Sequence, residues 1–497
     1  MTTIEPALAL WAAARDDGHT ALDAPLWRTY LTPTMPRDIG TSARRLLASH
    51  AWVRLPDGAL TTAAAAARAW HLAEMLAERY LRFSLPGSEI GHQEFPVIFS
   101  QDQSIAWQSL QERFLSILVG GPGTGKSFLI GRLAHSLKGV RVVTPTAKAA
   151  EVTRRYVGGA CEVSTIHSLL NWVPGELPAC GEVDKSIRVL IVDEMSMVDE
   201  HVFYELMLRV PLSTRVILVG DPDQLPPVSA GAPLADLVRM GWATRLTTVH
   251  RAALATGLPA LAADMRVGVC DLSRHQKVEV VHAPPIRSEF FAGLVAQIPL
   301  SWLPGDNLVL YPVRDEAKFR NTVGSLNAAL AHAHRGPIPS YLRAVEGNRV
   351  IGNRNDYSVG CVNGQLGTVL SASRAGYTIR WDNGRTSQLR GREDFNRPRF
   401  ELGYGMTIHR AQGSEARVVV LVLDPGCASA YAREGLYVAA TRARERLVCY
   451  GSPAVLTRAV GRTTARRTAL WSYLTAPGTP APAGVAMGAP AGEEDYG

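Results

Sequence analysis

One short segment constrains this chain more than any other: residues 120–127 read GGPGTGKS and fit the pattern G-x-x-x-x-G-K-[ST]. They follow the apolar run at 115–119 and precede a helical pattern, which is the context that the pattern requires. Glycines let backbone N–H groups surround phosphate oxygens at a helix N-terminus, Lys126 suits the β and γ phosphates, and the Ser127 hydroxyl suits Mg²⁺. The sequence therefore predicts a site for a nucleoside triphosphate and Mg²⁺. Contacts with the nucleotide are expected from Gly121, Pro122, Gly123, Thr124, Gly125, Lys126 and Ser127.

Two further polar segments fit this site. Asp193 and Glu194 follow the apolar run at 189–192, so Asp193 is expected to hold Mg²⁺ through water and Glu194 to polarise the attacking water. Paired acids that only cap a helix are the alternative. Gln224 lies in the sequence GDPDQLPP after another apolar run, where it is placed to sense the γ phosphate. A plain proline-rich turn is the alternative there.

The bulk composition sets wider bounds. With 497 residues, 46% of them hydrophobic, the chain can form roughly three or four compact units. Its net charge of +7 permits nucleic-acid binding without demonstrating it. The six cysteines lack the short spacing of zinc or iron–sulfur sites, which predicts reduced thiols. We find no basic-then-apolar leader and no apolar run of the ~18 to 20 residues that span a bilayer, and we expect a cytoplasmic protein without membrane contact.

Apolar runs separated by helical stretches predict an α/β fold with two parallel sheets. The first set of strands is expected at 115–119, 140–144, 189–192 and 215–219, and the second at 307–311, 418–423 and 447–450. Between parts of the second set, strands at 349–351, 367–370 and 377–381 read instead as a small β barrel with a tight hairpin turn at 382–384. The first ~95 residues read as helical, with Thr62 capping an alanine-rich helix. The proline- and glycine-rich tail predicts disorder.

Two segments near the C-terminus decide among nucleotide-binding classes. Residues 404–415 (YGMTIHRAQGSE) and 437–444 (YVAATRAR) strongly resemble the fifth and sixth motifs of superfamily 1 helicases. The resemblance implies two RecA-like domains with ATP between them, and arginine fingers supplied by Arg251 and Arg442. Such a finger is worth roughly 10³- to 10⁵-fold in rate in GTPases. The resemblance also implies that Glu415 contacts the nucleotide. A solvated surface arginine remains the alternative for Arg251.

Within that superfamily the chain looks similar to the RecD-like, 5′-to-3′ branch, called 1B. The segments that carry this resemblance are 144–150, 164–170, 193–197, 354–357 and 362–367. It covers about residues 96–452, identifies the β barrel as an SH3-like insertion, and makes Gln103 the partner of the adenine base. For Gln103 an ordinary helix start is the alternative. The resemblance implies contacts with single-stranded DNA from Thr146, Thr165, His167, Asn363, Thr407 and His409, each of which could instead cap a helix.

The expected domains follow from these assignments. They are a helical N-terminal region at 1–95 that includes a possible reduced winged helix, a first RecA-like domain at 96–250, a second at 251–341 and 403–473, an SH3-like domain at 342–402, and a disordered tail at 474–497. One departure from the RecD-like pattern stands out. The stretch at 171–186, where the family has a strand-separating hairpin, is short and holds Trp172.

The leading hypothesis is an ATP-dependent DNA translocase and helicase that acts 5′ to 3′ on single-stranded DNA and on duplexes with a 5′ overhang. One chain holds both halves of the ATP site, so a monomer suffices. A second hypothesis makes it the motor subunit of a larger complex for recombination, repair, conjugation or defence. A third is an NTP-driven switch that is indifferent to DNA.

Overall fold

The computed structural model describes residues 11, 14–15, 17, 19–23, 52–82, 99–173, 181–250, 257–272, 275, 277–282, 290–297, 307–312, 322–354, 356, 359–390 and 399–481. The chain forms two compact units. The first comprises residues 1–222, 226–250 and 465–497, and the second comprises 223–225 and 251–464. The chain therefore passes between the units at 222/223, 225/226, 250/251 and 464/465.

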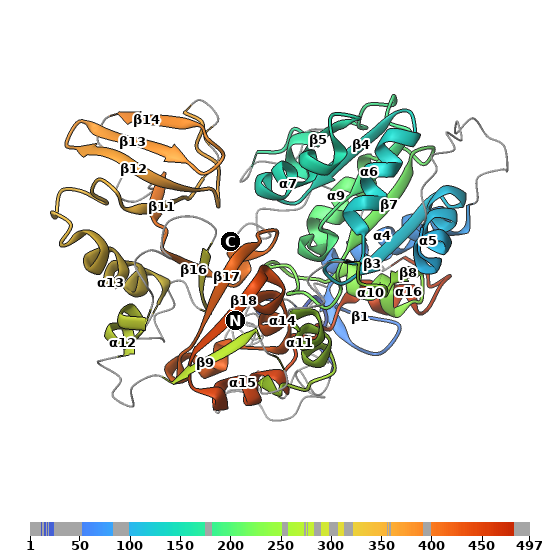
Figure 1. Ribbon diagram of the computed structural model, residues 1–497. Coiled ribbons are helices and arrows are strands. Elements are labelled where there is room, and N and C mark those ends of the chain that lie inside the picture. The colour runs from blue at the N-terminus through green and yellow to red at the C-terminus, as the bar shows by residue number, and fades with distance from the viewer. Residues whose placement is uncertain are drawn as a thin grey trace, which may run out of the picture. The chain divides into compact units, whose positions relative to one another are not determined.

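The first unit is built on a parallel sheet with strand order β5-β4-β6-β7-β3-β8 (Figure 1). The strands are β3 (Leu115–Gly120), β4 (Val140–Thr144), β5 (Glu162–Thr165), β6 (Val189–Val192), β7 (Arg215–Gly220) and β8 (Ala243–Leu246). The central strands are buried along their whole length, which explains their continuous apolar sequences. The four strands expected here are confirmed, and β5 and β8 complete the sheet.

Helices cover both faces of this sheet. Residues on one side of the strands, such as Ile117 and Leu190, pack with α4 (Ala63–Leu81), α8 (Ile166–Leu169), α9 (Glu200–Arg209), α10 (Pro233–Arg239) and α16 (Ala469–Leu474). Residues on the other side, such as Leu118 and Ile191, pack with α5 (Gln101–Glu112), α6 (Lys126–Ser136) and α7 (Ala147–Val157). Successive strand residues thus alternate between two cores, as the pleat requires. A short 3₁₀ helix, η1 (Met195–Met197), follows β6.

The N-terminal region is only partly helical. The antiparallel strands β1 (Trp52–Arg54) and β2 (Leu60–Thr62) form a hairpin directly before α4. As expected, Thr62 caps α4, because its side chain accepts a hydrogen bond from the backbone N–H of Ala65. Most of the region that could form the expected reduced winged helix, including residues 24–51, lies outside the described residues.

The second unit contains another parallel sheet, with strand order β16-β10-β17-β18-β9. Its strands are β9 (Val278–His282), β10 (Asn307–Tyr311), β16 (Gly405–Thr407), β17 (Ala416–Leu423) and β18 (Ala443–Gly451). The accompanying helices are α11 (Leu258–Arg266), α12 (Phe290–Gln297), α13 (Val323–Arg335), α14 (Arg433–Arg442), α15 (Pro453–Val460), η6 (His409–Ala411) and η7 (Pro425–Ala430). The three strands expected here are confirmed.

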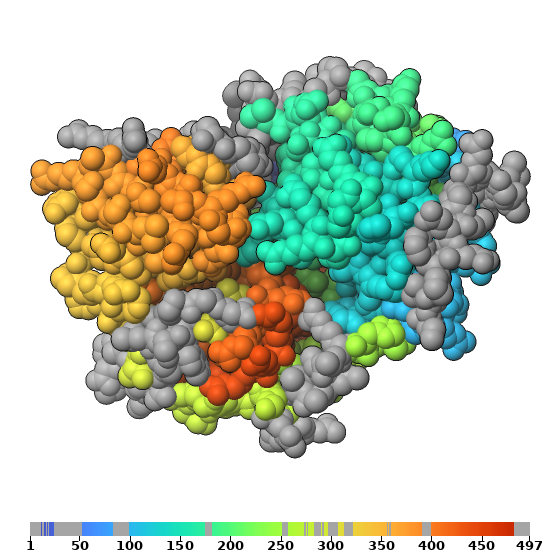
Figure 2. All heavy atoms as spheres, turned by 45° about the horizontal axis from the view of Figure 1, so that its top comes forward, coloured from blue at the N-terminus to red at the C-terminus, as the bar shows by residue number. Residues whose placement is uncertain are grey.

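A separate antiparallel sheet is inserted between α13 and β16, with strand order β14-β13-β12-β11-β15. Its strands are β11 (Arg349–Gly352), β12 (Leu366–Ser373), β13 (Gly376–Trp381), β14 (Thr386–Arg390) and β15 (Phe400–Leu402). The expected turn is present, since the backbone N–H of Trp381 donates to the carbonyl of Arg385 at 2.8 Å. Figure 2 shows the side chains of β12, β13 and β14, in orange, as one continuous mass. The sheet has its own buried core around Trp381 and Phe400.

The C-terminal segment differs from the expectation in one respect. We expected the second α/β domain to run to residue 473, but residues from 465 onward belong to the first unit, where α16 packs against α4. The described cysteines are all free thiols. None of the helices in the described part of the chain is long and apolar enough to cross a bilayer.

Candidate nucleotide and nucleic-acid sites

The phosphate loop lies between β3 and α6, at the carboxyl edge of the first sheet (Figure 1). Gly125 caps α6 with φ +94°, and a Cβ there would lie 2.3 Å from Nε2 of Gln103. Only glycine fits such a position. The Nζ of Lys126 donates to the carbonyls of Gly120 and Gly121 at 2.5 and 3.0 Å, so the loop is curled around its own lysine. The Oγ1 of Thr124 also donates to the carbonyl of Gly121, at 2.8 Å.

Gln103 is buried beside this loop. Its Oε1 accepts from the backbone N–H of Ser100 at 3.2 Å, and its Nε2 lies 3.5 Å from the carbonyl of Thr124. The side chain of Gln103 completes the capping box at the start of α5, so the helix-start alternative is present in the structure. Its role towards the base stays a prediction.

The start of α5 is also bound to the segment that follows β8. The Oδ2 of Asp102 accepts from the backbone N–H groups of Thr247 and Thr248, each at 2.8 Å. Partial burial of Asp102 favours its neutral form, but hydrogen bonds from Ser100 and from these amides outweigh it and hold its pKa below the ordinary value. The backbone N–H of His250 donates to the carbonyl of Gly123 at 2.8 Å. The next residue, Arg251, lies outside the described residues, and its expected role as an arginine finger stays a prediction.

The paired acids follow β6 at the same edge of the sheet. The carboxylate of Asp193 accepts from the Thr153 hydroxyl at 3.0 Å and, through a short contact, from the Tyr156 hydroxyl, both on α7. Burial and the neighbouring Asp193 carboxylate raise the pKa of Tyr156, so its hydroxyl keeps its proton. Glu194 adopts the left-handed conformation, with φ +56°, which is unusual for a non-glycine residue and is found at functional sites.

The donor set suits Mg²⁺, which prefers oxygen ligands and is usually held by one or two protein groups together with substrate phosphates. The Asp193 carboxylate and the Ser127 hydroxyl supply such oxygens, and Gly123 and Gly125 give the loop before Ser127 positive φ angles. Thr153 and Tyr156 were not predicted as site residues. Their spacing of three positions on a helix predicts a shared face, but nothing in the sequence names Asp193 as their partner.

Gln224 lies in the short stretch 223–225, which belongs to the second unit. Its Oε1 is buried and has no hydrogen-bond partner among the described residues. The residues on either side are bound within that unit: Asp223 pairs with the Arg266 guanidinium at 2.7 Å, and the carbonyl of Leu225 accepts from Nε2 of Gln412 at 3.3 Å. The backbone around Gln224 is therefore fixed while its amide oxygen is left available.

Arg442 is buried at the end of α14 and bound within the second unit. Its Nη1 donates to the carbonyl of Ser414 at 2.9 Å, its Nη2 to the Thr441 hydroxyl at 3.1 Å, and its Nε to the carbonyl of Val438 at 3.2 Å. The contact with Ser414 joins the two segments that the resemblance singled out. Ser414 directly precedes Glu415 in the sequence. The roles of Arg442 and Glu415 towards the nucleotide stay predictions.

Thr146 and Thr165 lie at the carboxyl ends of β4 and β5, and both cap helices. Their hydroxyl oxygens accept from the backbone N–H groups of Ala149 and Ser168, at 3.2 and 3.0 Å. The capping alternative is therefore real for both, although a capping hydroxyl keeps its hydrogen for another acceptor. His167 stacks on Trp172 with ring centroids 5.0 Å apart, and burial lowers its pKa, which Asp199 partly opposes. His167 is thus a neutral stacking group at pH 7.

Arg410 joins the expected DNA residues of the second unit. Its backbone N–H donates to the Thr407 hydroxyl at 3.1 Å, and its guanidinium donates to Oδ1 of Asn363 at 3.2 Å and to Oε1 of Glu401 at 2.6 Å. Two of these partners lie in or beside the antiparallel sheet, so Arg410 links that sheet to the segment that holds Thr407 and His409. No sequence pattern indicates this role of Arg410.

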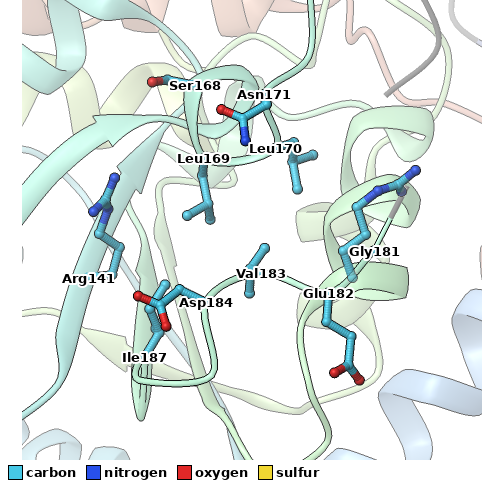
Figure 3. A pocket seen from close by; sticks show the side chains of 11 residues that line it. Arg141, Ser168, Leu169, Leu170, Asn171, Gly181, Glu182, Val183, Asp184 and Ile187 are labelled. Atoms are coloured by element: carbon cyan, nitrogen blue, oxygen red, sulfur yellow. The ribbon is translucent and has the colours of Figure 1, made fainter. Parts of the chain in front are cut away.

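A cavity of about 300 Å³ lies beside the end of α8 in the first unit (Figure 3). It is lined by Arg141, Arg209, the end of α8, Asn171, residues 181–184 and Ile187, so both ends of the stretch 171–186, expected to form a strand-separating hairpin, contribute to it. Trp172, Val183 and Ile187 are buried in the core of the first unit, so both ends of this stretch are anchored. Residues 174–180 lie outside the described residues, and the hairpin stays a prediction.

Two domain families match the chain: the AAA domain over residues 99–283 and the UvrD-like helicase C-terminal domain over residues 402–450. The ATP-dependent RecD2 DNA helicase of Deinococcus radiodurans is 34% identical over 377 residues, which cover 75% of this chain and 52% of that protein. The chain is similar to the RecD-like helicases. It spans about half the length of the Deinococcus relative and 74% of the RecBCD enzyme subunit RecD of Mycolicibacterium smegmatis, to which it is 29% identical over 425 residues.

Among solved structures, the chain is similar to the Pif1 helicase from Bacteroides in complex with ADP-AlF3 and single-stranded DNA. That similarity has 19% identity and a TM-score of 0.46, and it covers 71% of this chain and 92% of the other.

Proposed function

We propose that this RecD-like chain hydrolyses ATP to move along single-stranded DNA and to unwind duplexes. The observation that carries the proposal is the first unit's parallel sheet, where the phosphate loop and the Asp193–Glu194 pair occupy one carboxyl edge. Ligands of open α/β sheets bind at this edge. The similarity to a protein named as an ATP-dependent DNA helicase supports the proposed activity.

The chemistry follows from the positions of the side chains. Lys126 neutralises charge on the β and γ phosphates, in place of its present contacts with Gly120 and Gly121. Glu194 orients and deprotonates the attacking water, while Gln224 senses the γ phosphate. Mg²⁺ would be held by Ser127 and by Asp193, which two hydroxyls of α7 keep in place. The ion would supply positive charge next to the phosphoryl group that is being transferred. The resemblance assigns Arg251 and Arg442 to the same developing charge.

The proposed DNA track consists of small polar side chains and imidazoles. In the first unit, Thr146, Thr165 and His167 follow neighbouring strands. In the second unit, Arg410, which follows His409, links Thr407 to Asn363. Hydroxyls, amides and neutral rings suit phosphates and stacked bases without selecting a sequence. We infer little base specificity.

Direction and accessory parts belong to the same proposal. We infer 5′-to-3′ movement along DNA. We also infer an SH3-like insertion formed by β11 to β15 and a strand-separating hairpin within 171–186. The domain boundaries are those expected from the sequence, except that residues from 465 onward belong to the first unit. A reduced winged helix would include the β1–β2 hairpin. A single chain carries both α/β units, which supports activity as a monomer.

The test combines hydrolysis with unwinding. We expect ATP hydrolysis to be strongly stimulated by a single-stranded oligonucleotide, and the stimulation to fall steeply with salt as DNA is released. Hydrolysis indifferent to DNA would instead support an NTP-driven switch. Unwinding is then compared on duplexes with 5′ tails, 3′ tails and forks. Activity on 3′-tailed duplexes alone would contradict the proposed direction.

A motor subunit within a larger complex is the second candidate. It is favoured by similarity to RecD subunits of the RecBCD enzyme and to a conjugal transfer protein TraA, 28% identical over 378 residues, of which the chain covers 31%. This candidate predicts translocation with little unwinding by the isolated chain. Co-purification with a nuclease or relaxase, with unwinding restored, would support it.

A further inference from the structure

The C-terminal segment returns to the first unit at residue 465, and its second residue there, Arg466, is hydrogen-bonded to that unit. The guanidinium of Arg466 donates to three backbone carbonyls of the loop 226–231: Nη1 to Ser229 at 2.6 Å and to Gly231 at 2.7 Å, and Nη2 to Pro227. These carbonyls lie at alternate positions of one loop. A single side chain therefore fixes the path of the loop.

Neighbouring contacts hold the returning segment itself in place. The Thr468 hydroxyl donates to Asp236 at 2.6 Å, the backbone N–H of Ala469 donates to the Thr20 hydroxyl at 2.8 Å, and the backbone N–H of Arg467 donates to Nδ1 of His19 at 2.9 Å. These partners come from α10 and from the N-terminal part of the chain. Arg466 thus projects from a segment that is anchored on both its backbone and its side chains.

The loop that Arg466 binds begins two residues after Gln224. Residues 223–225 belong to the second unit and 226–231 to the first, so the chain crosses between the units just after Gln224. The returning segment makes its own crossing at 464/465, one residue before Arg466. Arg466 therefore connects, within the first unit, the chain that enters this unit at residue 226 with the chain that enters it at residue 465.

Gln224 consequently lies between two sets of anchors. On its own side, Arg266 binds Asp223 and Gln412 binds Leu225, while Arg466 binds the backbone from Pro227 onward. Since Oε1 of Gln224 is buried without a partner among the described residues, its position depends on the backbone on both sides. A change in the returning segment would move this backbone.

We propose that Arg466 is a positioning residue for ATP hydrolysis: by holding the loop 226–231, it sets Gln224 and couples the C-terminal return segment to turnover. This inference rests on the proposed ATPase function. Arg466 itself contacts no substrate. The competing role, in which Arg466 only stabilises the first unit, predicts lower stability but no dependence on Gln224.

The experiment is a double-mutant cycle of Arg466→Ala and Gln224→Ala, with kcat and KM for ATP measured in the presence of single-stranded DNA. A misplacement of a catalytic group by about 1 Å can cost up to ~10²-fold, so we expect kcat of Arg466→Ala to fall by roughly 10- to 100-fold with KM changed less than about twofold. In the Gln224→Ala background the same substitution should cost little more. Arg466→Lys, which keeps a cationic donor, should recover part of kcat and also serves if Arg466→Ala does not fold.

Arg462→Ala is the matched control, because Arg462 also donates to two backbone carbonyls, of Ala428 and Ser429, but within the second unit. It should leave kcat near the wild-type value. Additive losses in the double mutant, an unchanged kcat in Arg466→Ala, or an unchanged kcat in Gln224→Ala would each overturn the inference. Wild-type protein and Lys126→Ala are assayed alongside. If the wild type hydrolyses ATP and Lys126→Ala does not, the proposed function stands even where the role of Arg466 fails.

Discussion

The two parallel α/β units present their polar residues in different ways. In the first unit, the loop around Lys126 is shaped by glycines with positive φ, and the lysine binds only carbonyls of its own loop. In the second unit, Arg410 and Arg442 are bound to other segments of the chain. The first unit therefore contains a loop shaped by its own glycines, whereas in the second unit two arginines link segments that are distant in the sequence.

The difference separates two kinds of substitution. A change at the phosphate loop should remove chemistry while leaving the rest intact. A change at a linking arginine should alter how strongly DNA stimulates ATP hydrolysis. Measurements that report ATP hydrolysis and the response to DNA separately can test this difference between the two units.

The largest effect is expected from Lys126→Ala. Removing the ammonium group leaves the β and γ phosphates without their side-chain charge, and loss of one such electrostatic group costs about 10²- to 10³-fold in kcat. Binding of a fluorescent oligonucleotide should stay within about twofold, because the proposed DNA residues lie elsewhere. Lys138→Ala, which alters an exposed lysine beyond α6, is the control. If Lys126→Ala kept full turnover, the first unit would not be the nucleotide site.

Tyr156→Phe should have the next largest effect. It removes one of two hydroxyls that hold Asp193, and loss of such supporting groups typically costs about 10- to 100-fold in metal affinity or activity. We expect the Mg²⁺ concentration for half-maximal hydrolysis to rise while KM for ATP at saturating Mg²⁺ changes little. Tyr204→Phe is the control, since that hydroxyl contacts His71 at 3.2 Å, away from Asp193. Equal Mg²⁺ dependence in both variants would contradict the role of Tyr156.

Sequence patterns were sufficient for parts of the fold that depend on local order. The buried strands of both sheets are continuous apolar runs, and the phosphate loop contains its own glycines, so each could be predicted without knowledge of distant residues. The β1–β2 hairpin was missed because its strands have only three residues each, too few to show a period.

Long-range pairings could not be predicted from the sequence. Arg410 contacts Asn363, 47 positions earlier, and Arg466 contacts Gly231, 235 positions earlier. No spacing rule connects such residues. The end of the second domain was misplaced for the same reason, since α16 belongs to the first unit through contacts with α4 that its own sequence does not specify.

Arg410→Ala tests the linking role in the second unit. Loss of its charged hydrogen bonds, each worth about 1.5 to 3 kcal/mol, frees Asn363 and the segment after Thr407. We expect the DNA concentration for half-maximal stimulation to rise about tenfold or more, with hydrolysis in the absence of DNA unchanged. Arg417→Ala, which breaks an exposed pair with Glu445, is the control. A loss of basal hydrolysis alone would place Arg410 in the chemistry rather than in the linkage.

The smallest expected effect is a pH dependence of stability that originates in the first unit. Burial raises the pKa of Glu200 and that of Asp236 to about 7. At Glu200, Arg68 and Thr20 oppose this rise and Asp199 adds to it. At Asp236, Thr468, Arg239 and Arg467 oppose the rise and Glu200 adds to it. Because the folded pKa exceeds the unfolded one, the folded state binds protons that the unfolded chain has lost. Their contribution is complete below pH 4 and disappears as the pH rises through 7.

We therefore expect the melting temperature to fall by about 1 to 4 °C between pH 7 and pH 8, a window above the range in which the buried histidines titrate. Asp236→Asn and Glu200→Gln should each flatten this slope, since neutral amides have no proton to lose. Glu182→Gln, at an exposed pair with Lys185, should leave the slope unchanged. If the slope persisted in the Asp236→Asn and Glu200→Gln double variant, the titrating groups would be other than these two carboxyls.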